Sequence, residues 1–432
     1  MKQPPVPSYY AATAMPHEAC APLQGRQETR IAIVGGGYAG LNTALGLAER
    51  GVRDVVLLER ERIGFGASGR NGGFVFAGYS LGEQALLDQL GEARARALFG
   101  LTVAAVERIR ARIAQYAIAC DAVDEGVIWA NWFRDPDVLR RRQQLLADRY
   151  GVHWDWLPQK ELRERVRSDR YFDGLYERNA LHLHPLDYAI GLANAAAGLD
   201  VRIHETSEAW RLKREGSRWI VSTSQGELLA DQVVLACGGY LAGLRKPIDR
   251  AVLPIATYVM TTEPLGERLA GCLATRAAVY DSRFAFDYYR PLPDTRLLWG
   301  GRISIRNRSP QAVQRLLRRD LSRVFPQLAE AKIDYAWSGL MSYARHQMPQ
   351  LGRGEGDDAG LWWAQAFGGH GLAPTCAAGE LLAAAMAEGD EGWKQFSNYG
   401  LTSAHKPFGL LAAQFNYWWQ QARDGFKTRL EG

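Results

Sequence analysis

Three glycines near the start of the chain have the spacing of a dinucleotide-binding turn. Gly35, Gly37 and Gly40 form a G-x-G-x-x-G motif between an apolar run at residues 31–34 and a helical pattern at residues 41–50. The first glycine permits a tight turn, the second lets the backbone approach a pyrophosphate, and the third allows close packing of helix on sheet. Glu59 follows Gly40 by 19 residues, where a carboxylate can accept hydrogen bonds from an adenosine ribose.

A second glycine-rich segment, residues 63–73, comes directly after Glu59. It contains the stretch GASGRNGG at residues 66–73, in which Ser68, Arg70 and Asn71 separate the glycines. Such a loop cannot pack a core, but its backbone amides can surround a flat ligand while Ser68 and Arg70 reach a pyrophosphate. A merely flexible loop is the alternative, and its position after Glu59 argues against it.

The hydropathy pattern predicts the elements that must position these loops. Residues 31–34, 41–50 and 54–59 form a strand, helix, strand unit, and amphipathic helices follow over residues 81–118. Alternating polar and apolar residues over 245–334 favour an antiparallel sheet. We also expect strands at residues 126–130, 201–204, 231–235 and 361–364, and helices over residues 159–170 and 186–199.

These elements predict an α/β protein with a Rossmann-type dinucleotide domain and a second domain built on a mixed or antiparallel sheet. At 432 residues the chain exceeds the length at which one core usually stops growing. We expect an N-terminal arm over residues 1–29, a dinucleotide domain from residues 30–118, 171–244 and 336–395, a substrate domain from residues 119–170 and 245–335, and a tail or helix over residues 396–432.

Composition narrows the class of protein. Lys and Arg number 52 against 47 Asp and Glu, a difference of +5 with no long block of like charge that would mark a nucleic-acid or membrane surface, so we expect no nucleic-acid partner. The five cysteines are scattered without a CxxC pair, which favours a reducing cytoplasm and predicts no metal centre. Residues 1–23 lack the basic start and apolar core of a secretory signal. No apolar run approaches the roughly 20 residues that span a bilayer.

Short blocks over nearly the whole chain then point to one family. They are SYYAA at residues 8–12, GASGRNGG at 66–73, SDRY at 168–171, HPL at 184–186, DYYR at 287–290, FPQL at 325–328, WSG at 337–339, MPQ at 348–350 and GHG at 369–371. With them the chain resembles the FAD-dependent amine oxidoreductases related to D-amino-acid oxidase, glycine oxidase and sarcosine oxidase. Within that family it is most similar to the γ-glutamylputrescine oxidases.

The resemblance implies FAD as cofactor. The glycine motif would hold the pyrophosphate, Glu59 the ribose, the backbone of Ala209 the adenine, and the turn at residues 368–372 the pyrimidine edge of the flavin through N–H donors. The residues that it implies for cofactor binding are Gly35, Gly37, Tyr38, Ala39, Gly40, Glu59, Arg60, Gly66, Ala67, Ser68, Arg70, Asn71, Gly72, Gly73, Ala209, Ala236, Gly238, Gly339, Gly369, His370, Gly371 and Leu372. Cys376 is either a covalent attachment point or part of a helical core.

Amine oxidation over a flavin depends on positioning and desolvation more than on acid–base groups. The catalytic candidates are Tyr288, Tyr289 and His370, because His370 can titrate near neutrality; a spacer role for His370 stays open. The candidate substrate-binding residues are Trp129, Phe286 and Trp337 as aromatic walls and Arg290, Arg302 and Arg345 as anchors for a remote carboxylate. Core packing is the alternative for each aromatic residue. The γ-glutamylputrescine oxidases have arginine at the position of Gln347, which leaves the substrate open.

The resemblance implies an oxidase that acts on CH–NH or CH–NH2 donors with oxygen as electron acceptor. A γ-glutamylated polyamine such as γ-glutamylputrescine would give an aldehyde, ammonia and hydrogen peroxide in polyamine catabolism. The alternatives are an oxidase or dehydrogenase of sarcosine, proline or D-amino acids, and a catalytically silent flavin-binding subunit. For the aromatic run at residues 415–419 a docked terminal helix is expected rather than a membrane-facing one.

Overall fold

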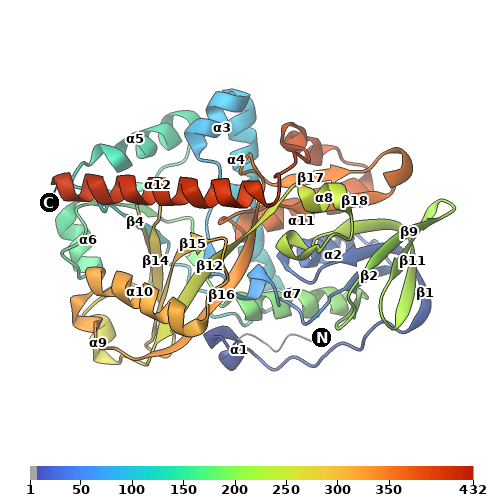
Figure 1. Ribbon diagram of the computed structural model, residues 1–432, viewed down its shortest axis with the longest axis horizontal. Coiled ribbons are helices and arrows are strands. Elements are labelled where there is room, and N and C mark those ends of the chain that lie inside the picture. Colours follow the sequence, from blue (N-terminus) through green and yellow to red (C-terminus); the bar gives the residue numbers. More distant parts are fainter. Residues whose placement is uncertain (1–6, 432) are drawn as a thin grey trace.

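The computed structural model describes residues 7–431. Its first sheet has eight strands: six lie in the order β17-β18-β11-β1-β2-β8, while β10 pairs with β11 and β9 with β10 (Figure 1). β1 pairs in parallel with both β2 and β11, as expected of a Rossmann-type sheet. The strands are β1 (Gly25–Val34), β2 (Val55–Leu58), β8 (Arg202–His204), β9 (Arg211–Glu215), β10 (Arg218–Ser222), β11 (Gly226–Leu235), β17 (Gln350–Arg353) and β18 (Leu361–Gln365).

The first sheet is buried on both faces. Along β1, Ile31 and Ile33 pack with the helices of one face, whereas Ala32 and Val34 pack on the other face with Trp219 of β10. Because successive side chains of a strand point to opposite faces, a strand covered on both sides needs a continuous apolar run. The main helices that share the cluster of Ile31 and Ile33 are α2 (Tyr38–Glu49), α4 (Glu92–Gln115), α7 (Pro185–Gly198) and α11 (Leu372–Glu388).

The second sheet has the strand order β16-β12-β15-β14-β13-β4-β6-β5 and is antiparallel except where β13 pairs with β4. Helix α10 (Pro310–Val324) packs on one face through Val313, Leu317 and Leu321. The predicted α/β fold class with a mixed second sheet is confirmed. The strands are β4 (Val127–Ala130), β5 (Asp155–Leu157), β6 (Gly174–Glu177), β12 (Leu253–Thr262), β13 (Ala278–Asp281), β14 (Asp287–Pro291), β15 (Leu297–Ser304) and β16 (Ile333–Tyr343).

Shorter elements complete the chain. β3 (Phe74–Val75) directly follows the second glycine-rich loop and pairs with β7 (Leu181–His182) in a two-stranded sheet. The remaining helices are α1 (Tyr9–Thr13), α3 (Glu83–Leu90), α5 (Asp137–Leu145), α6 (Gln159–Arg165), α8 (Lys246–Arg250), α9 (Glu267–Ala270) and α12 (Phe408–Glu431).

Several expected boundaries differ from the structure. Part of the expected N-terminal arm forms α1, whose Tyr9 and Tyr10 are buried, and β1 begins at Gly25 rather than at the expected residue 31. β6 and residues 336–343 of β16, both expected in the dinucleotide domain, belong to the second sheet. Hydropathy shows that such a strand is buried, but it does not show which of two apolar sheets the strand joins.

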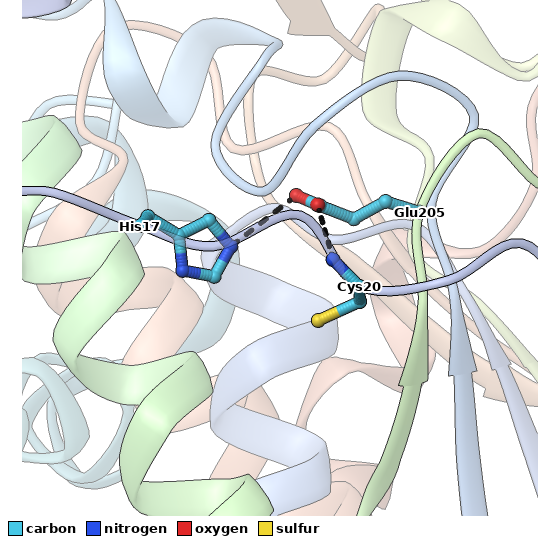
Figure 2. Close-up of side chains that lie close together, drawn as sticks. All are labelled: His17, Cys20 and Glu205. Atoms are coloured by element: carbon cyan, nitrogen blue, oxygen red, sulfur yellow. Dashed lines mark hydrogen bonds and ion pairs between the residues drawn. The ribbon is translucent and has the colours of Figure 1, made fainter.

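A buried glutamate fastens the N-terminal segment to the first sheet (Figure 2). Glu205 Oε2 accepts a hydrogen bond from the Cys20 N–H (3.0 Å). Its Oε1 accepts one from the Ile63 N–H (2.7 Å). His17 Nε2 and Arg62 Nε lie 3.4 and 3.1 Å from the carboxylate. Burial opposes ionisation, yet these partners together lower the pKa of Glu205. The side chains of His17, Cys20 and Glu205 are close enough to hold a metal ion, but the carboxylate is already engaged, so we interpret the cluster as an anchor.

The C-terminal helix α12 crosses the side of the molecule formed by the second sheet (Figure 1). Gln414, Tyr417 and Asp424 are its buried residues, so the helix is docked through this side, whereas its large apolar side chains on other sides are exposed. Within residues 7–431, no helix combines the length and apolar character that a bilayer crossing requires.

Candidate active site

A cavity of about 1180 Å³ lies between the two sheets. Its lining comes from the loops that follow β1, β2, β8, β11 and β18, and from strands β13 to β16 and α12. Ligands of open α/β sheets bind beyond the carboxyl ends of the strands, and this cavity lies there. The volume exceeds the roughly 300 to 1,000 Å³ of most small-molecule pockets, so the cavity suits a large ligand together with a smaller one.

The glycine motif places the N-terminus of α2 against this cavity. Gly35 has a φ of 118°, and a Cβ there would lie 2.6 Å from the Ala236 carbonyl oxygen, so only glycine fits. Gly37 caps α2 and lines the cavity. Gly40 does not line the cavity. A Cβ on Gly40 would lie 2.0 Å from the Gly35 oxygen, so the lack of a side chain at Gly40 lets α2 approach β1 closely. The free N–H groups of such a helix end favour a phosphate.

Glu59 follows β2 beside the glycine motif. Its Oε2 accepts a hydrogen bond from the Gly36 N–H (2.7 Å) and its Oε1 accepts one from the Glu61 N–H (2.9 Å). Burial raises the pKa of Glu59, and the two hydrogen bonds offset part of that rise. Since a carboxylate offers about four acceptor positions, two remain for hydroxyl donors such as those of a ribose.

Short-range hydrogen bonds shape the loop at residues 66–73. Ser68 Oγ accepts from the Tyr38 N–H at the start of α2 (2.9 Å). Asn71 Nδ2 donates to the Ser68 carbonyl (2.8 Å), and its Oδ1 accepts from the Gly73 N–H (2.8 Å). Asn71 therefore holds the loop in its curved form, while Ser68 joins the loop to α2.

Arg70 supplies this loop with a half-buried cation. Its guanidinium carbon lies 4.4 Å from the centre of the Phe65 ring, and the side chain lines the cavity. Burial lowers the pKa of Arg70, which makes no ion pair within residues 7–431. An unpaired cation is costly away from water, and Arg70 lines the same cavity as the N-terminus of α2, so both could bind an anionic pyrophosphate.

The turn before α11 lines another part of the cavity. Gly368 has a φ of 58°, and a Cβ there would lie 2.1 Å from Ser80 Oγ. The Gly369 N–H donates to Ser80 Oγ (3.0 Å). α11 begins at Leu372, so the positive end of its dipole meets the cavity, where it favours developing negative charge on a ligand.

Most of the residues predicted to bind the cofactor line this one cavity. They are Gly35, Gly37, Tyr38, Ala39, Glu59, Arg60, Gly66, Ala67, Ser68, Arg70, Asn71, Gly72, Ala209, Ala236, Gly238, Gly339, Gly369, His370, Gly371 and Leu372. Gly40 and Gly73 do not. A Cβ on Gly73 would lie 2.1 Å from the Leu183 oxygen, so Gly73 permits packing rather than ligand contact.

Comparison with known proteins agrees with this geometry. Residues 30–385 match the family described as FAD dependent oxidoreductase. The chain belongs to this family. A gamma-glutamylputrescine oxidoreductase of Escherichia coli (strain K12) is 36% identical over 404 residues, which cover 93% of this chain and 92% of that relative. FAD is therefore the cofactor that the glycine motif, Glu59 and Arg70 are suited to hold.

Two solved structures share the fold of this oxidoreductase. Glycine oxidase from Geobacillus kaustophilus superposes with a TM-score of 0.71 at 24% identity, covering 87% of this chain and 98% of that one. L-proline dehydrogenase from P. horikoshii gives a TM-score of 0.71 at 19% identity, covering 88% and 100%.

Aromatic side chains wall the part of the oxidoreductase cavity next to the second sheet. Tyr280 stacks between Trp129 and Phe76, with ring centres 5.7 Å apart on each side. Phe76 meets His370 edge-on at 4.9 Å, and Phe286 lies 6.0 Å from Tyr280. Because such a wall penalises an ammonium ion, it lowers the pKa of a bound amine and favours the free base.

Tyr288 fills a slot that two glycines leave open. A Cβ on Gly300 would lie 2.1 Å from Tyr288 Cζ, and one on Gly72 would lie 2.5 Å from Cε2. Burial raises the pKa of Tyr288, so its hydroxyl stays protonated and can donate a hydrogen bond. Of the two tyrosines predicted to be catalytic, Tyr288 lines the cavity.

Tyr289 does not line the cavity, which corrects the expectation that both tyrosines are catalytic. Its ring stacks on Trp299, with centres 4.6 Å apart, in the core beneath α10. Neighbouring residues of a strand point to opposite faces, so Tyr288 and Tyr289 cannot both face the cavity.

Arg290 and Trp337 were also expected to bind substrate, and the structure corrects this. Arg290 is fully buried and donates to the carbonyls of Gly72 (2.7 Å) and Leu183 (2.8 Å). Trp337 Nε1 donates to the Arg70 carbonyl (2.9 Å). Both side chains bind carbonyl groups of the glycine-rich loop without lining the cavity, so they position the loop that would contact the cofactor.

His370 lines the cavity as a neutral imidazole. Burial, followed by the charge of Arg142, lowers the pKa of His370 to about 4. The expectation that it titrates near neutrality is therefore wrong, since its surroundings penalise the imidazolium. A neutral ring that donates or accepts a hydrogen bond is the role that the geometry allows.

Two of the arginines expected to anchor a substrate carboxylate differ in whether they already form an ion pair. Arg302 lines the cavity, but its Nε and Nη2 bind both oxygens of Asp320 (2.7 and 2.6 Å). Arg345 also lines the cavity, is exposed, and has no ion pair within residues 7–431. Gln347, which stands where the γ-glutamylputrescine oxidases have arginine, also lines the cavity.

Sequence reasoning missed several lining residues. Phe76 and Ser80 follow the GASGRNGG loop closely and could have been found by continuing the path of the loop toward the flavin. Arg142, Tyr280 and Tyr417 come from distant segments and carry no local signal.

Cys376 is buried in α11, 4.0 Å from Arg112 Nη1, and does not line the cavity. Its place in the core supports the helical-core alternative over a covalent link to FAD.

Proposed function

We propose that this oxidoreductase oxidises the carbon–nitrogen bond of a γ-glutamylated polyamine, such as γ-glutamylputrescine, in polyamine catabolism. The observation that carries the proposal is the 36% identity, over 93% of the chain, to a gamma-glutamylputrescine oxidoreductase. The cavity supports it, because the aromatic wall suits an amine and Arg345 suits a remote carboxylate. Free thiols at all five cysteines fit a cytoplasmic location.

When bound, FAD accepts a hydride, which is two electrons and a proton, from the carbon beside the amine nitrogen. The residues of this chain act on the substrate: the wall of Trp129, Phe76 and Tyr280 excludes water, and Tyr288 and neutral His370 offer hydrogen bonds that orient it. The imine product takes up water to give an aldehyde and ammonia. Oxygen, as electron acceptor, is reduced to hydrogen peroxide.

An anaerobic flavin-reduction screen tests the substrate and the acceptor. γ-Glutamylputrescine should bleach the yellow protein faster than putrescine, sarcosine, proline or small D-amino acids, and readmitted air should yield peroxide. Faster bleaching by an α-amino acid or a secondary amine would overturn the proposed substrate. Reoxidation by a quinone but not by air would identify a dehydrogenase, and a flavin that no amine bleaches would indicate a silent subunit.

Arg345→Gln should raise the KM for γ-glutamylputrescine about 10- to 100-fold. This change corresponds to the loss of a charge-assisted hydrogen bond, which contributes roughly 1.5 to 3 kcal/mol. The KM for putrescine, which has no carboxylate, should change little. Arg353→Gln is the matched control, because it removes an exposed arginine outside the cavity. Equal effects on both amines would contradict the anchoring role of Arg345.

A further inference from the structure

Helix α12 turns its large apolar side chains toward solvent. These residues, here called the aromatic stripe, mostly follow one another at helical intervals of three, four or seven positions. They are Phe408, Leu411, Phe415, Trp418, Trp419, Phe426 and Leu430, with exposures between 48% and 75%.

Polar contacts fix this orientation of the helix. Gln414 Oε1 accepts a hydrogen bond from the Ile305 N–H (3.1 Å), and Asp424 Oδ2 accepts one from the Phe284 N–H (2.8 Å). A helix packed on a globular core normally buries its apolar side and exposes its polar side. Here the buried residues are polar and the stripe is exposed, and an exposed apolar surface of this kind marks an interaction site.

A groove of about 890 Å³ runs beside the stripe, between α12 and α10. Leu411, Phe415 and Trp418 line it from α12. The facing arginines, here called the basic rim, are Arg306, Arg308, Arg319 and Arg323.

The basic rim is weakly neutralised. Arg306, Arg308 and Arg319 have no ion pair within residues 7–431, and Arg323 lies 3.6 Å from Asp320, which Arg302 already binds. The lining contains one carboxylate, that of buried Asp424. The groove thus combines an apolar wall with excess positive charge.

We propose that the aromatic stripe and the basic rim dock this enzyme on the surface of an anionic lipid bilayer. Tryptophan and phenylalanine favour the level of the lipid headgroups, and arginine pairs with phosphate. A second copy of the chain is a poorer occupant, because its own basic rim would bring like charge into the interface. Asn416 and Tyr417 of the same helix line the active-site cavity, so docking would place that cavity close to the lipid.

Co-sedimentation of the FAD-loaded protein with vesicles tests the proposal. We expect binding to phosphatidylcholine vesicles that contain roughly one-third phosphatidylglycerol, and little binding to pure phosphatidylcholine. Phe415→Ser/Trp419→Ser should reduce the partition coefficient at least about tenfold. Arg306→Glu/Arg319→Glu should do the same, because both positive charges are reversed.

Arg53→Glu/Arg211→Glu is the matched control, since it changes the net charge equally at two exposed arginines outside both cavities. The control should bind like the wild type, and every variant should keep its flavin and its turnover of soluble amine. Equal binding to neutral vesicles, or none to either kind, would overturn the proposal. So would a concentration-dependent dimer that Phe415→Ser/Trp419→Ser dissociates, because a second copy would then be the occupant.

Discussion

His370 shows how one side chain of the cavity lining couples the active site to pH. In the folded chain, burial and Arg142 lower its pKa to about 4, against about 6.5 for an unperturbed histidine. Between these two values the unfolded chain binds a proton at this position and the folded chain does not. Acidification through that window therefore favours unfolding, and the stability present above pH 6.5 is lost as the pH falls.

His370→Gln should reduce this acid sensitivity. Between pH 7 and pH 5 the wild type should lose up to about 2 kcal/mol more stability than the variant, since glutamine takes up no proton. Thermal melting of the FAD-loaded proteins at both pH values measures the difference. His153→Gln, at an exposed histidine, should behave like the wild type. If His370→Gln lost as much stability as the wild type, the neutral state assigned to His370 would be wrong.

At the scale of elements, strands β14 and β15 decide the shape of the cavity wall. β15 pairs with β12 on one side and β14 on the other, so its backbone has little room to move. Gly300 of β15 leaves the space that Tyr288 of β14 occupies. The position of the tyrosine thus depends on a missing side chain in the neighbouring strand.

Gly300→Ala should destabilise the protein by about 1 to 3 kcal/mol, because the added methyl group overlaps the Tyr288 ring. Tyr288→Leu in the same chain should restore most of the loss, as measured by the melting temperature. Gly198→Ala is a suitable control, since a Cβ there meets no atom within 4 Å. A destabilisation that Tyr288→Leu leaves unchanged would show that the backbone, not the ring, is the obstacle.

Local pattern was enough to predict the strand, helix, strand unit around Gly35 and Glu59, because its periodicity and its glycine turn lie within one short segment. The second sheet could not be predicted in the same detail. β4 pairs with β13 from far along the chain, and such pairings depend on tertiary packing. The predicted catalytic role of Tyr289 and the predicted substrate-binding role of Arg290 were wrong for a related reason. A motif does not show to which face of a strand a side chain points or how deeply it is buried.

At the scale of the whole molecule, the cavity joins segments from Gly35 near the start to Tyr417 near the end. The cofactor residues of the first sheet and the aromatic wall of the second thus share one ligand-binding space. A ligand that binds only the folded chain stabilises it in proportion to its concentration. FAD should therefore hold the loops of both sheets together.

Removal of FAD should lower the melting temperature and make the chain more sensitive to trypsin at Arg70 of the glycine-rich loop and at Arg60 just before it, both of which line the cavity. Restored FAD at about 100 times its Kd should return about 2.7 kcal/mol of stability. Time-resolved trypsin digestion with and without added FAD checks both points. Cleavage after Arg211, which is exposed and outside the cavity, should not depend on FAD. A loop cleaved at the same rate in both forms would contradict its assigned contact with the cofactor.

The basic rim also belongs to this scale. A net charge of +5 without a long charged block gave no sign of it, because Arg306, Arg319 and Arg323 come near the aromatic stripe only where the folded chain forms the groove. The sequence therefore suggested a docked helix but not the groove beside it.

The contact of Gly72, Tyr288 and Gly300 also limits how this enzyme can evolve. The Tyr288 ring occupies the space that side chains at positions 72 and 300 would need. Neither glycine can therefore be replaced by a larger residue before Tyr288 is replaced by a smaller one. Among homologues the three positions should covary, and a chain with alanine at 300 should carry a smaller residue than tyrosine at 288. In directed evolution toward bulkier amines the order of changes follows: position 288 first, and only then variation at 72 and 300.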